Sequence, residues 1–284
     1  MPLYLVFYFW VLVISALVCV LERFFPRQKG QEILRPEFVQ DLFWMVFNTQ
    51  YVAWMLAIVT ASAVAALNSA FLHFEVQPSS LRLISHWPLW AQFAVFFLAK
   101  DFIEWNVHLA LHRVPWLWRF HQLHHSARHL DWAVAFRSHW GELLIYKLLV
   151  YLPLVVLGVD DRVVFAILVC SLLIQEISHA NLKWDWGPLR WLINSPRFHS
   201  WHHDVELHGR AGQNFGVNLV VWDWLFGTAH WPGRHESPAT YGFAGIERYP
   251  TGIWSRLWRP FRLTEVAPDG RTPANENGDG HPHR

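Results

Sequence analysis

The chain has 284 residues but only two cysteines, few charged residues and no cluster of lysines or arginines. Cys19 and Cys170 each lie in an apolar run, which excludes a disulfide framework or a zinc ribbon and indicates packing roles. A formal net charge of +1 without a basic patch excludes nucleic acid as a partner. Soluble domains carry about 25% charged residues, whereas this chain has 16% charged and 53% hydrophobic residues. The composition therefore favours a membrane protein.

Long apolar runs account for this composition, and they predict an all-α, integral membrane protein with about four or five membrane-embedded helices. The runs lie at residues 3–21, 42–67, 89–107, 143–158 and 163–177. The first run has no basic residue before it and no small-residue cleavage site after it, so we interpret it as a retained span rather than a signal peptide. The last two runs predict a tight helical hairpin that spans or enters the bilayer; the alternative is two buried core helices.

The distribution of basic residues predicts the orientation in the membrane. The segment after the first run carries Arg23, Arg27, Lys29 and Arg35, whereas residues 68–88 carry only Arg82. We therefore expect the first segment to be cytoplasmic, and the third run to return the chain to that side. Tryptophan favours the lipid headgroup region, and many of the 19 tryptophans lie outside the runs. This predicts a cytoplasmic, histidine-rich helical cap that rests on the membrane.

The most specific pattern is formed by eight of the 18 histidines, which fall into three compact boxes. The boxes are His108-Leu-Ala-Leu-His112, His121-Gln-Leu-His124-His125 and His199-Ser-Trp-His202-His203. Residues three and four apart share one face of a helix. Pro115 can start a helix before the second box, and Ser195 and Pro196 are a natural N-cap and first helical residue before the third. Each box can therefore present its imidazoles together to a metal ion.

The number of these imidazoles favours two metal ions rather than one. Eight histidines exceed the three or four protein ligands of a single zinc site. His179, at the end of the last apolar run, is the candidate for a ninth ligand, with a capping role as the alternative. Imidazole binds iron, copper, nickel and zinc, so the ligand type leaves the metal open. Because the boxes follow the ends of predicted spans, we expect all three on the cytoplasmic side.

Acidic side chains near the first box are candidates to orient its histidines. Asp101 and Glu104 fall near the helical stripe of the first box and could accept the second ring N–H of a ligand histidine. The alternative is a solvated helix end with an ion pair to Lys100. Further candidates for this outer layer around the metal are His139, Glu142 and Asn181.

In order, spacing and flanking residues, the three boxes resemble the fatty acid hydroxylase/sterol desaturase superfamily. The flanking residues are Arg113 after the first box, Leu117-Trp118-Arg119-Phe120 before the second, and Ser195-Pro196-Arg197-Phe198 before the third. Gln213-Asn214-Phe215-Gly216 and Trp222-Asp223-Trp224-Leu225-Phe226-Gly227-Thr228 resemble the closing signature of that superfamily, and the resemblance covers roughly residues 95–230. Trp224 is a departure, because many members have a basic residue there. His179 is another, because some fatty acid 2-hydroxylases have two histidines spaced by three.

The resemblance implies a membrane-bound, non-haem di-iron enzyme in which the boxed histidines hold two iron ions and O₂ is the co-substrate. It implies hydroxylation of a C–H bond of a lipid, such as a fatty acyl chain or a sterol; desaturation on the same centre is the alternative. The lipid would come from the bilayer, and a separate ferredoxin or cytochrome b5-type protein would supply electrons. A metal-binding membrane protein without catalysis, such as a transporter, is the alternative from another class. Such a protein would place its ligands in mid-membrane, whereas these boxes lie at span ends.

The sequence also predicts a division into three parts. Residues 1–88 are expected to form an N-terminal membrane region with two spans. Residues 89–235 form the expected catalytic domain, which includes the hairpin at 143–177, and residues 236–284 form a C-terminal extension. From about residue 264 the chain has no apolar periodicity, which predicts disorder.

Overall fold

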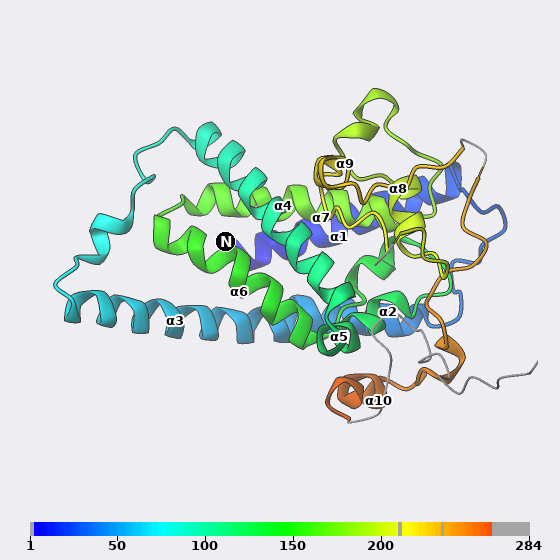
Figure 1. The fold of residues 1–284 in the computed structure, drawn as a ribbon, viewed down its shortest axis with the longest axis horizontal. Coiled ribbons are helices and arrows are strands. Elements are labelled where there is room, and N and C mark those ends of the chain that lie inside the picture. Colours follow the sequence, from blue (N-terminus) through cyan, green and yellow to red (C-terminus); the bar gives the residue numbers. More distant parts are fainter. Residues whose placement is uncertain (1–2, 210–211, 234–235, 263–284) are drawn as a thin grey trace, which may run out of the picture.

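The computed structural model describes residues 3–209, 212–233 and 236–262, and in these residues the chain is helical (Figure 1). The long helices are α1 (Leu3–Phe24), α2 (Phe38–Val46), α3 (Ala53–His73), α4 (Leu89–Arg113), α5 (Pro115–His125), α6 (Trp140–Leu157) and α7 (Asp161–His179). The short helices are α8 (Pro196–His202), α9 (Val221–Phe226) and α10 (Ile253–Trp258). Among the described residues there are isolated β-bridges but no strands. The all-α prediction is confirmed.

Helical turns of other types connect these elements. A π-helical segment, η1 (Phe47–Val52), joins α2 to α3 without a break. The 3-10 turns are η2 (Pro78–Leu81), η3 (Trp132–Phe136), η4 (Gly187–Trp191), η5 (Ile246–Arg248) and η6 (Arg259–Phe261). The element η3 follows the second histidine box and is important for the site described below.

Three helical segments of the described chain are long and apolar enough to cross a membrane: Leu5–Phe24, Phe38–His73 and Asp161–His179. They contain most or all of the predicted spans at 3–21, 42–67 and 163–177, so a membrane protein is the consistent reading of sequence and structure. The charged residues Lys100, Asp101 and Glu104 interrupt the apolar run of α4. That α4 and α6 are also embedded in the membrane stays a prediction. The same holds for the total of four or five embedded helices.

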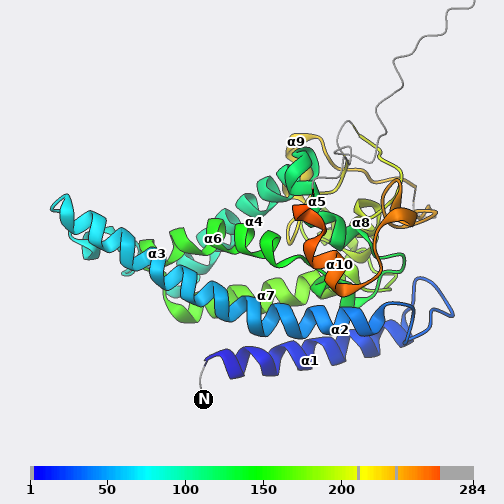
Figure 2. The ribbon, with the colours of Figure 1, turned by 90° about the horizontal axis from the view of Figure 1, so that it is seen from below.

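The long helices form a bundle in which α4 crosses the others diagonally (Figure 1). Helix α1 packs against α7, α4 packs against both α6 and α7, and α3 packs along α6. A short turn joins α6 to α7 as predicted, with Gly158 at φ 78° and the Asp160 carboxylate accepting from the backbone N–H of Arg162. Helices α5, α8 and α10 gather at the end of the bundle opposite the tip of α3 (Figures 1 and 2).

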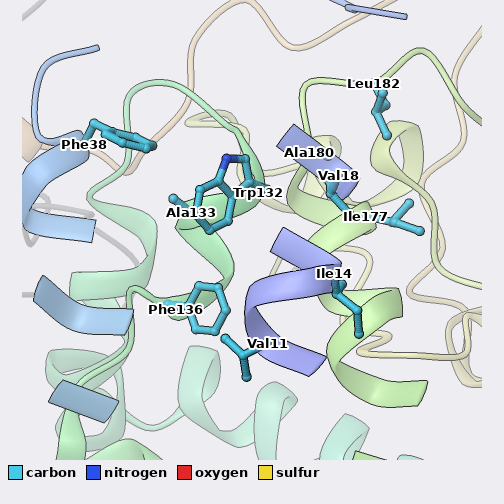
Figure 3. Packing of buried hydrophobic residues seen from close by; sticks show 10 residues of the cluster. All are labelled: Val11, Ile14, Val18, Phe38, Trp132, Ala133, Phe136, Ile177, Ala180 and Leu182. Carbon is cyan, nitrogen blue, oxygen red and sulfur yellow. The ribbon is translucent and has the colours of Figure 1, made fainter. Parts of the chain in front are cut away.

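An apolar core fixes η3 between α1, α2 and α7 (Figure 3). Val11, Ile14 and Val18 of α1 are three and four residues apart, so they share the buried face of that helix. Against them pack Trp132 and Phe136 of η3, together with side chains of α2 and α7. This packing determines where the loop after the second box lies.

The C-terminal part of the described chain also packs onto the bundle. Leu257 of α10 shares an apolar cluster with Trp44 of α2 and Leu123 of α5. A β-bridge joins Tyr241 to Asp204, directly after the third box. Residues 236–262 therefore share packing with the rest of the molecule, while the predicted boundaries at 88 and 235 stay predictions. The disorder predicted from about residue 264 lies outside the described residues.

Candidate metal centre

Four helices deliver the nine candidate ligands to one end of the bundle. The first box ends α4, and the second occupies α5, which begins at Pro115 as expected. The third lies in α8 and the residue after it; Ser195 caps α8 by accepting from the backbone N–H of Phe198 at 3.1 Å. His179 is the last residue of α7. The local signals read from the sequence thus place each box on a helix.

The structure brings the nine histidines together in two groups, in each of which the ring nitrogens lie within 4.8 Å of one another. The five-histidine group contains His108, His112, His121, His125 and His202. The four-histidine group contains His124, His179, His199 and His203. The second and third boxes contribute to both groups, because neighbouring residues of a helix point about 100° apart. Two adjacent sites of imidazole ligands result, which fits two metal ions.

Backbone carbonyls orient the rings in both groups. In the five-histidine group, Nδ1 of His108 contacts the Phe215 carbonyl at 2.8 Å, and Nδ1 of His202 contacts the Gln213 carbonyl at 2.9 Å. In the four-histidine group, His124 contacts the Arg137 carbonyl at 3.2 Å and His179 contacts the Gln175 carbonyl at 2.8 Å. A carbonyl oxygen only accepts, so each Nδ1 carries the proton and each Nε2 presents a lone pair.

These lone pairs face one another, which tests whether the residues suit a metal. The Nε2 atoms of His124 and His179 are 3.1 Å apart, and neither carries a proton to share. The Nε2 atoms of His125 and His202 are also 3.1 Å apart. In addition, Nε2 of His112 is buried without a hydrogen-bond partner in the described chain. Converging lone pairs in a buried space are stabilised by a cation, so the residues fit a metal in each group.

The electrostatics of α5 and α8 support the same conclusion. Burial lowers the pKa of the histidines of the second and third boxes well below 6.5, and the neighbouring imidazoles lower it further. The rings are therefore neutral at physiological pH. Only the neutral ring can bind a metal through a nitrogen lone pair.

The structure places Asp101 and Glu104 differently from the prediction that either orients a ligand histidine. Asp101 accepts from the backbone N–H of Asn218 at 3.0 Å and from Nε1 of Trp222 at 2.8 Å. Glu104 pairs with Lys100 at 2.5 Å and also accepts from the Asn218 side chain. The Phe215 carbonyl, and not a carboxylate, contacts Nδ1 of His108, and the ion pair between Glu104 and Lys100 is the one given as the alternative. Asp101 is seven residues before His108, about two helical turns away, and its carboxylate holds the loop at Asn218 and Leu219.

Of the other three candidates for the outer layer, one contacts a ligand candidate. Oε1 of Glu142 lies 2.9 Å from Nδ1 of His121. Nε2 of His139 contacts the Leu257 carbonyl at 2.9 Å, and its ring packs outside both groups. Asn181 accepts from the backbone N–H of Gln28 at 2.8 Å and so ties the loop after α1 to the end of α7.

Sequence reasoning missed the residue that shapes the loop beside His108. The buried carboxylate of Asp223 accepts from the backbone N–H groups of Phe215 at 2.9 Å and Gly216 at 2.7 Å. It also accepts from Trp105 at 3.1 Å and from Thr228 at 2.6 Å. This fixes the peptide whose carbonyl orients His108. Asp223 and Thr228 belong to the motif noted at residues 222–228, but nothing in that motif indicated which backbone they hold.

Comparisons with known proteins agree with this geometry. A model of the fatty acid hydroxylase family matches residues 93–228, which contain all nine histidines. The chain is similar to the ornithine lipid hydroxylase OlsE of Rhizobium tropici, with 31% identity over 252 residues, covering 87% of this chain and 72% of that protein.

More distant relatives share only part of their length with this chain. Similarity to the human alkylglycerol monooxygenase is 27% over 186 residues, which cover 61% of this chain and 40% of that protein. A very-long-chain aldehyde decarbonylase, GL1-8 of Oryza sativa subsp. indica, is 28% identical over 149 residues, covering 51% of this chain and 54% of that protein. The chain thus spans less than half the length of the human alkylglycerol monooxygenase. No solved structure matches it.

Proposed function

Because this chain belongs to the fatty acid hydroxylase family, we propose that it is a membrane-bound, O₂-dependent lipid hydroxylase with two iron ions in its two histidine groups. The observation that carries the proposal is the pair of buried groups of neutral imidazoles with converging lone pairs. Iron held there would supply the activation of O₂ that oxidation of an unreactive C–H bond requires. The protein contributes the ligands, their orientation and a site from which bulk water is excluded.

The overall reaction also defines what else the protein needs. Hydroxylation converts a C–H bond, O₂, two electrons and two protons into an alcohol and one water molecule. Because the reaction consumes two electrons, we propose a separate ferredoxin or cytochrome b5-type donor. The five- and four-histidine groups are the proposed ligand sets, and Glu142 is the proposed orienting carboxylate.

The family and the distribution of basic residues support a proposal for where the centre lies. We propose a multi-pass protein with its histidine groups on the cytoplasmic side. Arg27, in the basic segment after α1, donates to the Pro196 carbonyl at the start of α8 at 3.1 Å. This contact supports the proposal, because it puts the basic segment and the third box at the same end of the molecule. A lipid could then reach the centre from the bilayer and the electron donor from the cytoplasm.

For the substrate, we propose a polar membrane lipid of the ornithine lipid type. The similarity to the ornithine lipid hydroxylase extends over 87% of this chain, whereas similarity to the human alkylglycerol monooxygenase extends over 61%. A desaturase on the same centre is the second candidate that the sequence leaves open. The relatives named hydroxylase and monooxygenase favour insertion of oxygen over formation of an alkene.

Analysis of lipid products under ¹⁸O₂ tests this function. The gene would be expressed in a bacterial host that makes ornithine lipid, with a His108→Ala variant as the inactive control. We expect an ornithine lipid that carries one ¹⁸O atom, at least 100-fold reduced in the control. An alkene without ¹⁸O would support the desaturase instead. A protein that holds two iron ions but changes no lipid, when ferredoxin and cytochrome b5 donors are supplied, would contradict catalysis.

A further inference from the structure

A buried ionic network joins the N-terminal region to the loop that follows the second box. We call it the Arg137 network; its members are Arg35, Glu37, Asp41, Asp131, Arg137 and Arg256. The guanidinium of Arg137 is fully buried and donates to both carboxylate oxygens of Asp41, at 2.8 Å for Oδ2. Such a bidentate pair fixes both position and orientation. Asp41 of α2 therefore holds the side chain of Arg137 in one place.

A second contact from the same region fixes the backbone on both sides of Arg137. Nδ2 of Asn48 donates to the carbonyls of Phe136 and Ser138, each at 2.9 Å. Asn48 lies in the π-helical segment η1, and interruptions of this type are frequent at functional sites. The Arg137 carbonyl is left free of this contact, and it accepts instead from Nδ1 of His124 at 3.2 Å.

We propose that Asp41 and Asn48 are positioning residues for the four-histidine group. Together they fix the Arg137 carbonyl, which holds the His124 ring with its Nε2 toward His179. The Arg137 guanidinium also donates to Ser126, two residues after His124, at 3.3 Å. The inference rests on the proposed function, because it assigns these residues to one of the two proposed iron sites. Neither residue lies in the segment 93–228 that the family model matches.

The expected effect is a change in iron affinity confined to one site. Partners that orient a ligand histidine typically contribute 10- to 100-fold to metal affinity. Without the Arg137 carbonyl in place, His124 loses the one hydrogen bond that the structure gives its Nδ1. Three of the five rings in the five-histidine group are oriented by Phe215, Gln213 and Glu142, which are not members of the Arg137 network. Their iron should be unaffected.

Chelator titration of the purified full-length protein measures this effect. The variants are Asp41→Asn and the milder Asn48→Ala, and iron per chain is followed as chelator is added. The first control is Asp160→Asn, which removes a partly exposed carboxylate paired with Arg162. The second is Asn106→Ala, which removes an exposed amide that donates to the Phe102 carbonyl. We expect one of two irons to be bound about 10-fold or more weakly in each variant and both to be unchanged in the controls.

Two further backgrounds identify the affected site. In a His202→Ala background, which leaves the four-histidine group complete, Asn48→Ala should weaken the remaining iron about 10-fold. In a His124→Ala background it should have no effect, because the ligand that it positions is absent. Equal weakening in both backgrounds, or none in either, would overturn the proposal. If the wild-type protein does not bind two irons, the proposed function fails instead, so the two failures are distinguishable.

Discussion

The two histidine groups use the same kind of ligand but are supported from different parts of the molecule. In the five-histidine group, three rings are oriented by Phe215, Gln213 and Glu142, all within the segment that the family model matches. In the four-histidine group, the Gln175 carbonyl orients His179 from within that segment, but His124 depends on the Arg137 carbonyl, whose position is set by α2 and η1 outside it. Two neighbouring metal sites can therefore have ligands that are oriented by different parts of the chain.

The difference follows from where each ligand stands on its helix. The five-histidine group lies between α4, α5 and α8, and the loop at residues 213–216 closes over it. The four-histidine group includes His179 at the end of α7, on the side where η3 packs against α1 and α2. A ligand at a helix end has no following turn to support it. The segment after α1 supplies part of that support, because Asn181, two residues after His179, accepts from the backbone N–H of Gln28.

Removal of one histidine ligand from either group should have the largest effect on the iron content of the protein. His202→Ala should remove the iron of the five-histidine group and His124→Ala that of the four-histidine group, because each leaves an incomplete set of imidazoles. We expect iron to fall from about two ions to about one per chain in each variant, with lipid hydroxylation lost in both. Elemental analysis of the purified protein measures this. Unchanged iron content in both variants would contradict the dinuclear reading.

Substitution of Glu142 should have a smaller effect on iron binding. The effect should be confined to the five-histidine group, whereas Asp41 and Asn48 act on the four-histidine group. Its carboxylate orients His121 at 2.9 Å, so Glu142→Ala should weaken iron in the five-histidine group by about 10- to 100-fold. Glu142→Gln keeps an oxygen that can accept from the ring and should weaken iron less. The same chelator titration measures both variants. Loss of iron from the four-histidine group first would show that the two groups do not have separate support.

The sequence predicted the helices and the nine histidines, because both leave local signals. Pro115 and Ser195 start α5 and α8 where expected, and the spacing of four residues keeps His108 with His112, His121 with His125 and His199 with His203. The expectation that each box presents all its imidazoles to one metal ion is wrong for the second and third boxes, which contribute to both groups. The division into five and four was not predictable, because it depends on how α4, α5, α7 and α8 meet. His124 and His125 are adjacent in sequence but point into different groups.

Most of the contacts that orient the histidine rings could not be predicted from the sequence, for a different reason. Four of the partners of Nδ1 atoms are backbone carbonyls, which any residue can provide. Asp101 was a reasonable candidate by helical spacing, but its carboxylate holds the loop at Asn218 and Leu219 instead. Glu142 could be proposed because ligand histidines often donate to a carboxylate, and because it lies three residues after His139, another candidate; the structure instead places it beside His121. The roles of Asp41 and Asn48 required the three-dimensional structure.

The smallest expected effect comes from Ser195, which supports both groups at once. Helix α8 and the residue after it carry His202 of one group and His199 and His203 of the other. Ser195→Ala removes the N-cap hydrogen bond to Phe198, which should cost about 1 kcal/mol of stability. Thermal unfolding in detergent should show a lower Tm, and Ser195→Thr, which keeps a hydroxyl cap, should restore most of it. Because α8 is shared, iron should weaken slightly and equally in both groups. A loss confined to one group would mean that the cap acts on that group alone, and that the separation between the two groups begins within α8.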